Sequence, residues 1–478
     1  MIPLELRALL PFMILAAAPV AIMINIAIYR NHEIAFSLAL GGIGFAILFL
    51  PVTGTILPES GAPLLSFDSY ALFFITMILL AGIATLLTAF GYLNLHRSDP
   101  EEFYILILTA LLGASILVSS VHLAAFFLGL EIMSVSLYAL IAYEKLNNAG
   151  VEAGIKYFIL AAFSSSFLIF GMALIYADSG ILSFTRMSAI SAEKGLHPIL
   201  IAGVILISVG IGFKLAVVPF HMWVADVYEG APAPVTGFIA TVSKGAVFAV
   251  LLRFFLPVDV SGGNSLSIFF ATVAIASMII GNLLALFQDN VKRLLAYSSI
   301  AHMGYLLVAY KAYDALRITT VLFYLAAYFI ANLGAFGVVT VLSNENRDAD
   351  RIEDYRGLFL RRPWLAGAFT AMLLSLAGIP LTVGFIGKFT ILAAGISNFL
   401  YIQVLILIAT SILGLVYYLR ILIALYISPA NEAETAAPSA LPMPIAILAL
   451  SILIILLFGL GIYPGPLLDA ISALRSGG

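Results

Sequence analysis

The sequence contains no cysteine, so this chain can form no disulfide and supply no thiolate ligands to an iron–sulfur cluster. Charge is also scarce, at 10% of 478 residues, whereas an ordinary soluble domain has about 25%. The formal net charge of −3 gives no reason to expect nucleic acid as a partner. The six histidines lack metal-binding spacing, and neither a GxGxxG fingerprint nor a GxxxxGK(S/T) phosphate loop is present. We therefore expect no metal and no cofactor on this chain.

Apolar residues make up 63% of the chain, more than a soluble fold of this length can cover with polar surface. A helix needs about 20 apolar residues to cross the hydrocarbon core of a membrane. The sequence predicts an all-α multi-pass membrane protein, a single membrane domain over 1–478, with about fourteen transmembrane helices. The expected spans are 8–29, 34–57, 71–95, 103–120, 121–143, 153–176, 198–222, 230–256, 266–288, 291–310, 316–343, 364–397, 401–427 and 441–463.

The first apolar run resembles a signal peptide, because it follows Arg7 and contains three successive alanines at 16–18. The run continues to Ile28, however, which is a spanning length, so we expect a retained helix. With the N-terminus outside, eleven lysines and arginines fall in inner loops and seven in outer ones. This bias favours both termini on the outer face.

The four remaining basic residues and one acid lie inside apolar runs: Glu131, Lys156, Lys214, Lys244 and Lys388. A charge at the centre of a span costs roughly 2.5–3.5 kcal/mol, so the four that lie near mid-span together cost roughly 10 kcal/mol. Such residues by default indicate an ion or proton pathway. Lys156 is nearer the start of its span, where a lysine can also extend to the membrane surface.

Lysine suits proton transfer because a desolvated lysine can release its proton, whereas arginine stays protonated. Glu131 is a candidate counter-charge for Lys214, and a change in their separation would switch the proton affinity of the lysine. The alternative is an inert set of buried ion pairs that holds helices together. Three mid-span lysines against one glutamate do not balance, which weakens this alternative.

Two spans carry glycines, a proline and a lysine within one apolar run, at Ser208–His221 and Leu376–Lys388. Pro219 and Pro380 predict broken helices there, because proline removes a backbone donor and clashes with the preceding turn. The two spans are five apart in the count. We therefore expect two five-helix repeats, 103–256 and an inverted 266–427, as in transporters.

His221, beside Pro219, and His302 are candidate secondary stations for protons, although a lone histidine in a bundle can equally be structural. Hydroxyl side chains at 164–166, 241 and 243 could hold water between stations. For these hydroxyls we favour the alternative of helix packing.

Four motifs resemble the antiporter-like subunits of respiratory complex I, the proton-translocating NADH:quinone oxidoreductase. They are HLAAFFLGLE at 122–131, GFKLAVVPFHMWVADVYEGAPAPV at 212–235, VKRLLAYSSIAH at 291–302 and SLAGIP at 375–380. The resemblance spans the whole chain. Of the three branches of the family, L, M and N, the chain is most similar to N, because it has a lysine at 388 and no room for a long C-terminal arm.

The resemblance implies fourteen transmembrane helices and proton translocation driven by quinone reduction elsewhere in the complex. It identifies Glu131, Lys156, Lys214, Lys244 and Lys388 as channel residues and matches His221 to a family position. NADH, FMN, iron–sulfur clusters and quinone would be held by other chains. The implied partners are a neighbouring antiporter-like subunit, small membrane subunits, the peripheral redox arm and lipid, in the cell inner membrane.

Three other functions remain open at the level of sequence. The first is a subunit of a cation/proton antiporter, against which Lys388 and the chain length argue. The second is the equivalent subunit of a membrane complex fed by hydrogen, ferredoxin or a reduced deazaflavin. The third is a scaffold that supports assembly only.

Overall fold

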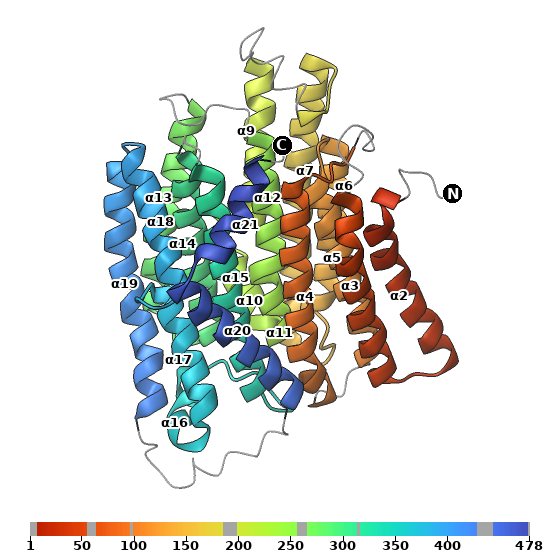
Figure 1. The fold of residues 1–478 in the computed structure, drawn as a ribbon, viewed down its shortest axis with the longest axis vertical. Helices are drawn as coiled ribbons and strands as arrows, with labels where there is room; N and C mark the ends of the chain where they lie inside the picture. Colours follow the sequence, from red (N-terminus) through yellow and green to blue (C-terminus); the bar gives the residue numbers. More distant parts are fainter. Residues whose placement is uncertain are drawn as a thin grey trace.

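A computed structural model describes residues 7–54, 64–95, 99–184, 198–255, 265–312, 316–427 and 443–476. Within these ranges the regular structure is helical, and the helices run side by side in one bundle (Figure 1). The start of α2 (Leu10–Ile28) and the end of α21 (Gly465–Ser476) lie toward the upper end of the bundle in this view, and the short helix α16 (Leu358–Arg361) lies at the lower end. This arrangement fits an even number of crossings.

The first half of the bundle contains α2 (Leu10–Ile28), α3 (His32–Gly54), α4 (Ser69–Leu95), α5 (Pro100–Ser119), α6 (Leu123–Ile141), α7 (Asn148–Ser179), α9 (Pro198–Leu215), α10 (Val224–Gly230), α11 (Ala233–Phe238) and α12 (Lys244–Phe255). The second half contains α13 (Ser265–Leu286), α14 (Val291–Lys311), α15 (Leu316–Leu342), α17 (Pro363–Ala377), α18 (Val383–Ser397), α19 (Tyr401–Tyr426), α20 (Pro444–Ile462) and α21 (Gly465–Ser476).

Twelve helices among the described residues are long and apolar enough to cross a membrane. Two further expected spans coincide with α14, which has 21 residues, and with the consecutive short helices α17 and α18. The prediction of an all-α multi-pass membrane protein is therefore confirmed. The span Ala233–Phe254 is wholly buried, whereas only a third of α7 and of α19 is, so these two helices lie at the periphery and turn large apolar side chains outward.

Both predicted helix breaks are present. The first separates α9 from α10: Ala216 adopts a φ of 58°, and a cis peptide bond joins Val218 to Pro219. The second separates α17 from α18, where Gly378 has a φ of 84° that ends α17. The two chain segments at this break pack closely, because a Cβ on Gly384 would collide with the carbonyl oxygen of Ser375. Each break therefore follows from the local residues that the sequence placed there.

A third irregularity was not predicted. The span expected at 230–256 begins as α11, changes to a π-helix over Ile239–Ser243, and continues as α12 from Lys244. Single π turns in α-helices occur often at functional positions, because the wider turn changes the direction of the next side chain. Here the next side chain is that of Lys244, one of the buried lysines.

Candidate functional site: a row of buried lysines

Lys214 is the penultimate residue of α9, directly before the helix break, and is 1% exposed. Its Nζ donates a hydrogen bond of 2.7 Å to Oγ of Ser134 on α6. The ring of Tyr157 on α7 lies 5.3 Å from the same nitrogen. The lysine is thus held between three helices, with a hydroxyl and an aromatic face around its charge.

Glu131 lies one helical turn before Ser134 on α6 and is half-buried. Its Oε1 accepts a hydrogen bond of 2.6 Å from Oγ of Ser165 on α7. Within the described residues it forms no ion pair with Lys214, so the expected counter-charge does not contact the lysine directly in this structure. The two charges bind separate serines, Ser165 and Ser134. For Ser165, helix packing is therefore an incomplete explanation.

Lys244 and Lys388 repeat the pattern of Lys214. Lys244 is fully buried, and its Nζ donates to Oγ of Ser299 on α14 at 2.6 Å. Lys388, 8% exposed on α18, donates to Oγ of Ser411 on α19 at 2.7 Å and to the carbonyl of Ala377 at 2.9 Å. That carbonyl is at the end of α17, where the helix break leaves it without an intrahelical partner. All three mid-span lysines therefore hydrogen-bond a serine of another helix.

Helix α14 connects the surroundings of Lys244 and Lys388. It supplies Ser299 to Lys244, and it places the ring of Tyr305 5.3 Å from Nζ of Lys388. His302 lies between them on the same helix, with its ring 5.5 Å from that of Tyr305. Ser299, His302 and Tyr305 therefore place polar groups about one turn apart along α14 between the two lysines.

His302 is enclosed by tyrosine hydroxyls. Its Nδ1 is 2.6 Å from the hydroxyl of Tyr324, and its Nε2 is 3.4 Å from that of Tyr418. The Tyr418 hydroxyl is also 2.6 Å from Oγ of Ser298. Each of these groups can exchange donor and acceptor roles, which is what a proton relay requires.

Lys156 differs from the other lysines. Its side chain is 46% exposed, and it forms ion pairs with Glu152 at 2.8 Å and Asp226 at 3.0 Å. Asp226 also binds Nη1 of Arg293 at 2.9 Å. Lys156 therefore belongs to a charged cluster at the periphery, as the proximity to the start of its span suggested.

The remaining predicted residues lie at the breaks. Pro219 and His221 are in the turn that connects α9 to α10, and Pro380 is in the turn between α17 and α18. Nδ1 of His221 is buried and has no hydrogen-bond partner among the described residues. It lies beside the first break, and no hydrogen bond among the described residues joins it to Lys214.

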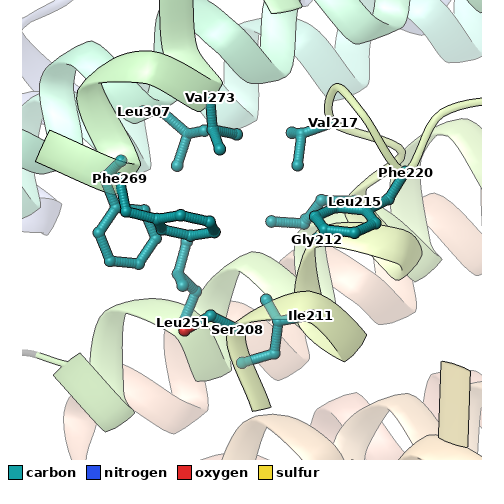
Figure 2. A pocket seen from close by; sticks show the side chains of 11 residues that line it. Ser208, Ile211, Gly212, Leu215, Val217, Phe220, Leu251, Phe269, Val273 and Leu307 are labelled. Atoms are coloured by element: carbon teal, nitrogen blue, oxygen red, sulfur yellow. The ribbon is translucent and has the colours of Figure 1, made fainter. Parts of the chain in front are cut away.

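A cavity beside the first break has a different character (Figure 2). Its walls include Ile211, Leu215, Phe220, Phe269 and Leu307, and Ser208 is its one polar side chain. No lysine, glutamate or histidine lines it. The buried lysines therefore lie outside this cavity, in contact with serines and aromatic rings.

The serines that bind the lysines were not predicted from the sequence. Ser134 follows Glu131 by one helical turn, and Ser299 stands in a quoted motif, so both positions carried a weak signal. Ser411 carried none, because it stands in none of the motifs, although it lies on the helix that follows α18. Among the residues that the structure describes, no group of three or more histidine, aspartate or glutamate side chains is placed to hold a metal ion.

Comparison with known proteins identifies the family. Residues 120–414 match the model of the NADH:quinone oxidoreductase/Mrp antiporter transmembrane family. The chain belongs to this family. All five predicted pathway residues fall within the matched segment.

Individual members of the family are similar over nearly the whole chain. NADH-quinone oxidoreductase subunit N of Methylococcus capsulatus is 46% identical over 97% of this chain and 94% of its own length. A chain of respiratory complex I from Thermus thermophilus, solved with bound aureothin, is 33% identical, covers 98% of this chain and 100% of its own, and has a TM-score of 0.83. A chain of the Mrp complex from Dietzia sp. shares the fold, with a TM-score of 0.84 at 21% identity, over 98% of this chain and 97% of its own.

Proposed function

We propose that this chain is the N-type antiporter-like subunit of a proton-translocating NADH:quinone oxidoreductase. The observation that carries the proposal is the set of three buried lysines, each hydrogen-bonded to a serine of another helix, in a chain 46% identical to such a subunit. A structural helix would not keep three charges at this depth. Quinone reduction elsewhere in the complex would drive the proton movement.

The contacts suggest an order of stations. Glu131 and Lys214 form the first station, since Glu131 of α6 binds a serine of α7 and Lys214 of α9 binds a serine of α6. Lys244 follows, and Ser299, His302 and Tyr305 of α14 lead from it to Lys388. A change in the separation of Glu131 from Lys214 would alter the proton affinity of Lys214. Lys156 at the periphery and His221 at the first break are further candidates.

The two five-helix repeats, 103–256 and 266–427, are part of this proposal. Each contains one broken helix, which supports them. The lysines are placed differently, however, because Lys214 precedes its break and Lys388 follows its break. The two halves would therefore correspond in the presence of a helix break but not in the position of the lysine relative to that break.

The membrane location and the partners of the chain follow from the same proposal. The chain would lie in the cell inner membrane, with both termini on the outer face. Its partners would be a neighbouring antiporter-like subunit, small membrane subunits, lipid and the peripheral arm. NADH, FMN, iron–sulfur clusters and quinone would be bound by other subunits, which agrees with the lack of cysteine here.

Replacement of Lys214 or Lys388 by methionine tests the proposal. Quinone reductase activity and protons pumped per electron are measured in inverted vesicles that contain the assembled complex. We expect both variants to assemble and to pump fewer protons per electron, because methionine keeps the volume and cannot carry a proton. Lys145→Met is the control, since this exposed lysine lies in a loop. Unchanged pumping in both variants would leave a scaffold role.

A second set of vesicles tests the antiporter alternative, which the shared fold of the Mrp chain motivates. Sodium-driven proton movement by vesicles that contain this chain alone would favour that alternative. Proton movement that requires NADH and quinone supports the proposed function. For Glu131→Gln, we expect a loss of pumping similar to that of Lys214→Met, because a neutral glutamine can no longer alter the proton affinity of Lys214.

A further inference from the structure

The short helix α10 lies between the surroundings of Lys214 and Lys244. At its start, Nε1 of Trp223 donates a hydrogen bond of 2.9 Å to the carbonyl oxygen of Phe213, the residue before Lys214. Near its end, the ring of Tyr228 lies 5.5 Å from Nζ of Lys244. A shift of α10 would therefore change the environment of both lysines together.

Two cations from different parts of the chain hold the middle of α10. Asp226 accepts from Nζ of Lys156 on α7 at 3.0 Å and from Nη1 of Arg293 on α14 at 2.9 Å. Arg293 also binds Glu229 of α10 at 2.6 Å, and Asn290 donates to the same glutamate at 3.2 Å. One carboxylate thus joins α7 of the first half to α14 of the second.

The C-terminal end of α10 is held as firmly. Nζ of Lys292 donates to the carbonyl oxygen of Ala231 at 2.8 Å and forms an ion pair with Asp348 at 2.5 Å. A Cβ on Gly230 would lie 2.6 Å from the carbonyl oxygen of Ala149 on α7. This end of α10 therefore packs against α7 without spare room.

We propose that Asp226 is a positioning residue for proton transfer between Lys214 and Lys244, and that Lys156 acts by holding Asp226. The inference rests on the proposed function and deepens it. Each ion pair is partly exposed and weak by itself. Asp226 joins two of them in the middle of a seven-residue helix, however, so the loss of its charge removes the ion pair between α10 and α7 and leaves Lys156 and Arg293 with fewer acceptors. Tyr228 and Trp223 then move relative to the lysines.

This assignment separates two roles for Lys156. A proton station must release its proton, which arginine cannot do. A cation that holds Asp226 needs only its charge and reach. Lys156→Arg therefore keeps proton pumping if the lysine positions Asp226, and Lys156→Gln lowers it. Loss of pumping in both variants would instead make Lys156 a station.

The decisive experiment uses the assembled complex in inverted vesicles, with Asp226→Asn, Asp226→Glu and the control Asp289→Asn. Asp289 is an exposed acid whose side chain binds Arg420, and the residue after it, Asn290, donates to Glu229 of α10. We expect Asp226→Asn to lower protons per electron about three-fold, within the range of residues that act through another element. Asp226→Glu should restore most of the ratio, and Asp289→Asn should leave it unchanged.

One outcome would contradict the positioning role of Asp226, and a different outcome would contradict the proposed function. Pumping in Asp226→Asn equal to that in Asp289→Asn, while Lys214→Met pumps less, removes the positioning role and leaves the proposed function intact. Normal pumping in Lys214→Met removes the proposed function itself. If Asp226→Asn fails to assemble, Lys156→Arg and Lys156→Gln decide the question, because the first keeps and the second removes one of the two cations.

Discussion

At the scale of single residues, the buried charges are satisfied by hydroxyl groups of neighbouring helices. Ser134, Ser299 and Ser411 each accept a hydrogen bond from a lysine, and Ser165 donates one to Glu131. A serine hydroxyl can accept one hydrogen bond and donate another, so it stabilises a charged lysine without trapping it in an ion pair. These contacts differ from an inert set of buried salt bridges, and they are compatible with the proton pathway that we propose.

The serine beside Lys214 provides a prediction. Ser134→Ala leaves the buried ammonium without its hydroxyl acceptor, a loss of about 1–3 kcal/mol for an unsatisfied buried group. We expect fewer protons per electron, with the complex still assembled. Ser136→Ala is the matched control, because Ser136 lies on the same helix and, within the described part of the chain, donates to the carbonyl of Ile132 and to no lysine or carboxylate. Equal pumping in the two variants would contradict a role for the Ser134 contact.

At the scale of elements, the irregular helices carry the lysines. Lys214 ends α9 at the first break, Lys244 follows the π-helix, and Lys388 reaches back to the carbonyl that the second break leaves free. The sequence predicted the two breaks, because glycine and proline act locally on the backbone. The π-helix was missed, because Ile239–Ser243 contains neither residue and its geometry depends on packing.

The second break can be tested by packing. Gly384→Ala places a Cβ against the carbonyl oxygen of Ser375, so α17 and α18 must move apart. We expect a loss of stability of about 1–3 kcal/mol, as for other overpacked sites, measured as a lower midpoint of thermal unfolding of the complex. Gly367→Ala on α17 is the control, since its Cβ meets no atom within 4 Å. An equal midpoint for both variants would show that the break has room to adapt.

At the scale of the whole molecule, lipid-facing apolar side chains surround a mainly apolar interior in which a few buried polar and charged groups lie. The most buried spans, Ala233–Phe254 and Arg317–Leu342, lie in the centre, while peripheral helices such as α7 and α19 turn large apolar residues outward. Charged residues outside the apolar spans pair with one another, as Lys292 does with Asp348. This separation of charge from apolar surface is what a membrane imposes.

The orientation of the molecule is a further prediction. The chain lacks cysteine, so a single introduced cysteine can be labelled without interference. We expect Leu146→Cys, in an exposed inner loop, to react with an impermeant thiol reagent in inverted vesicles and to be protected in right-side-out vesicles. Arg7→Cys, near the N-terminus, should show the opposite pattern. The reverse result for both would place the termini on the inner face.

The sequence by itself determined the membrane class, the approximate spans, the two breaks and the identity of the buried charges. These depend on composition and on local backbone chemistry, which a single chain displays directly. Only the tertiary structure decided which groups the charges meet. Glu131 and Lys214 bind different serines, Ser411 approaches Lys388 from another helix, and Asp226 joins α7 to α14. These partners are remote in sequence, and helix packing alone brings them together.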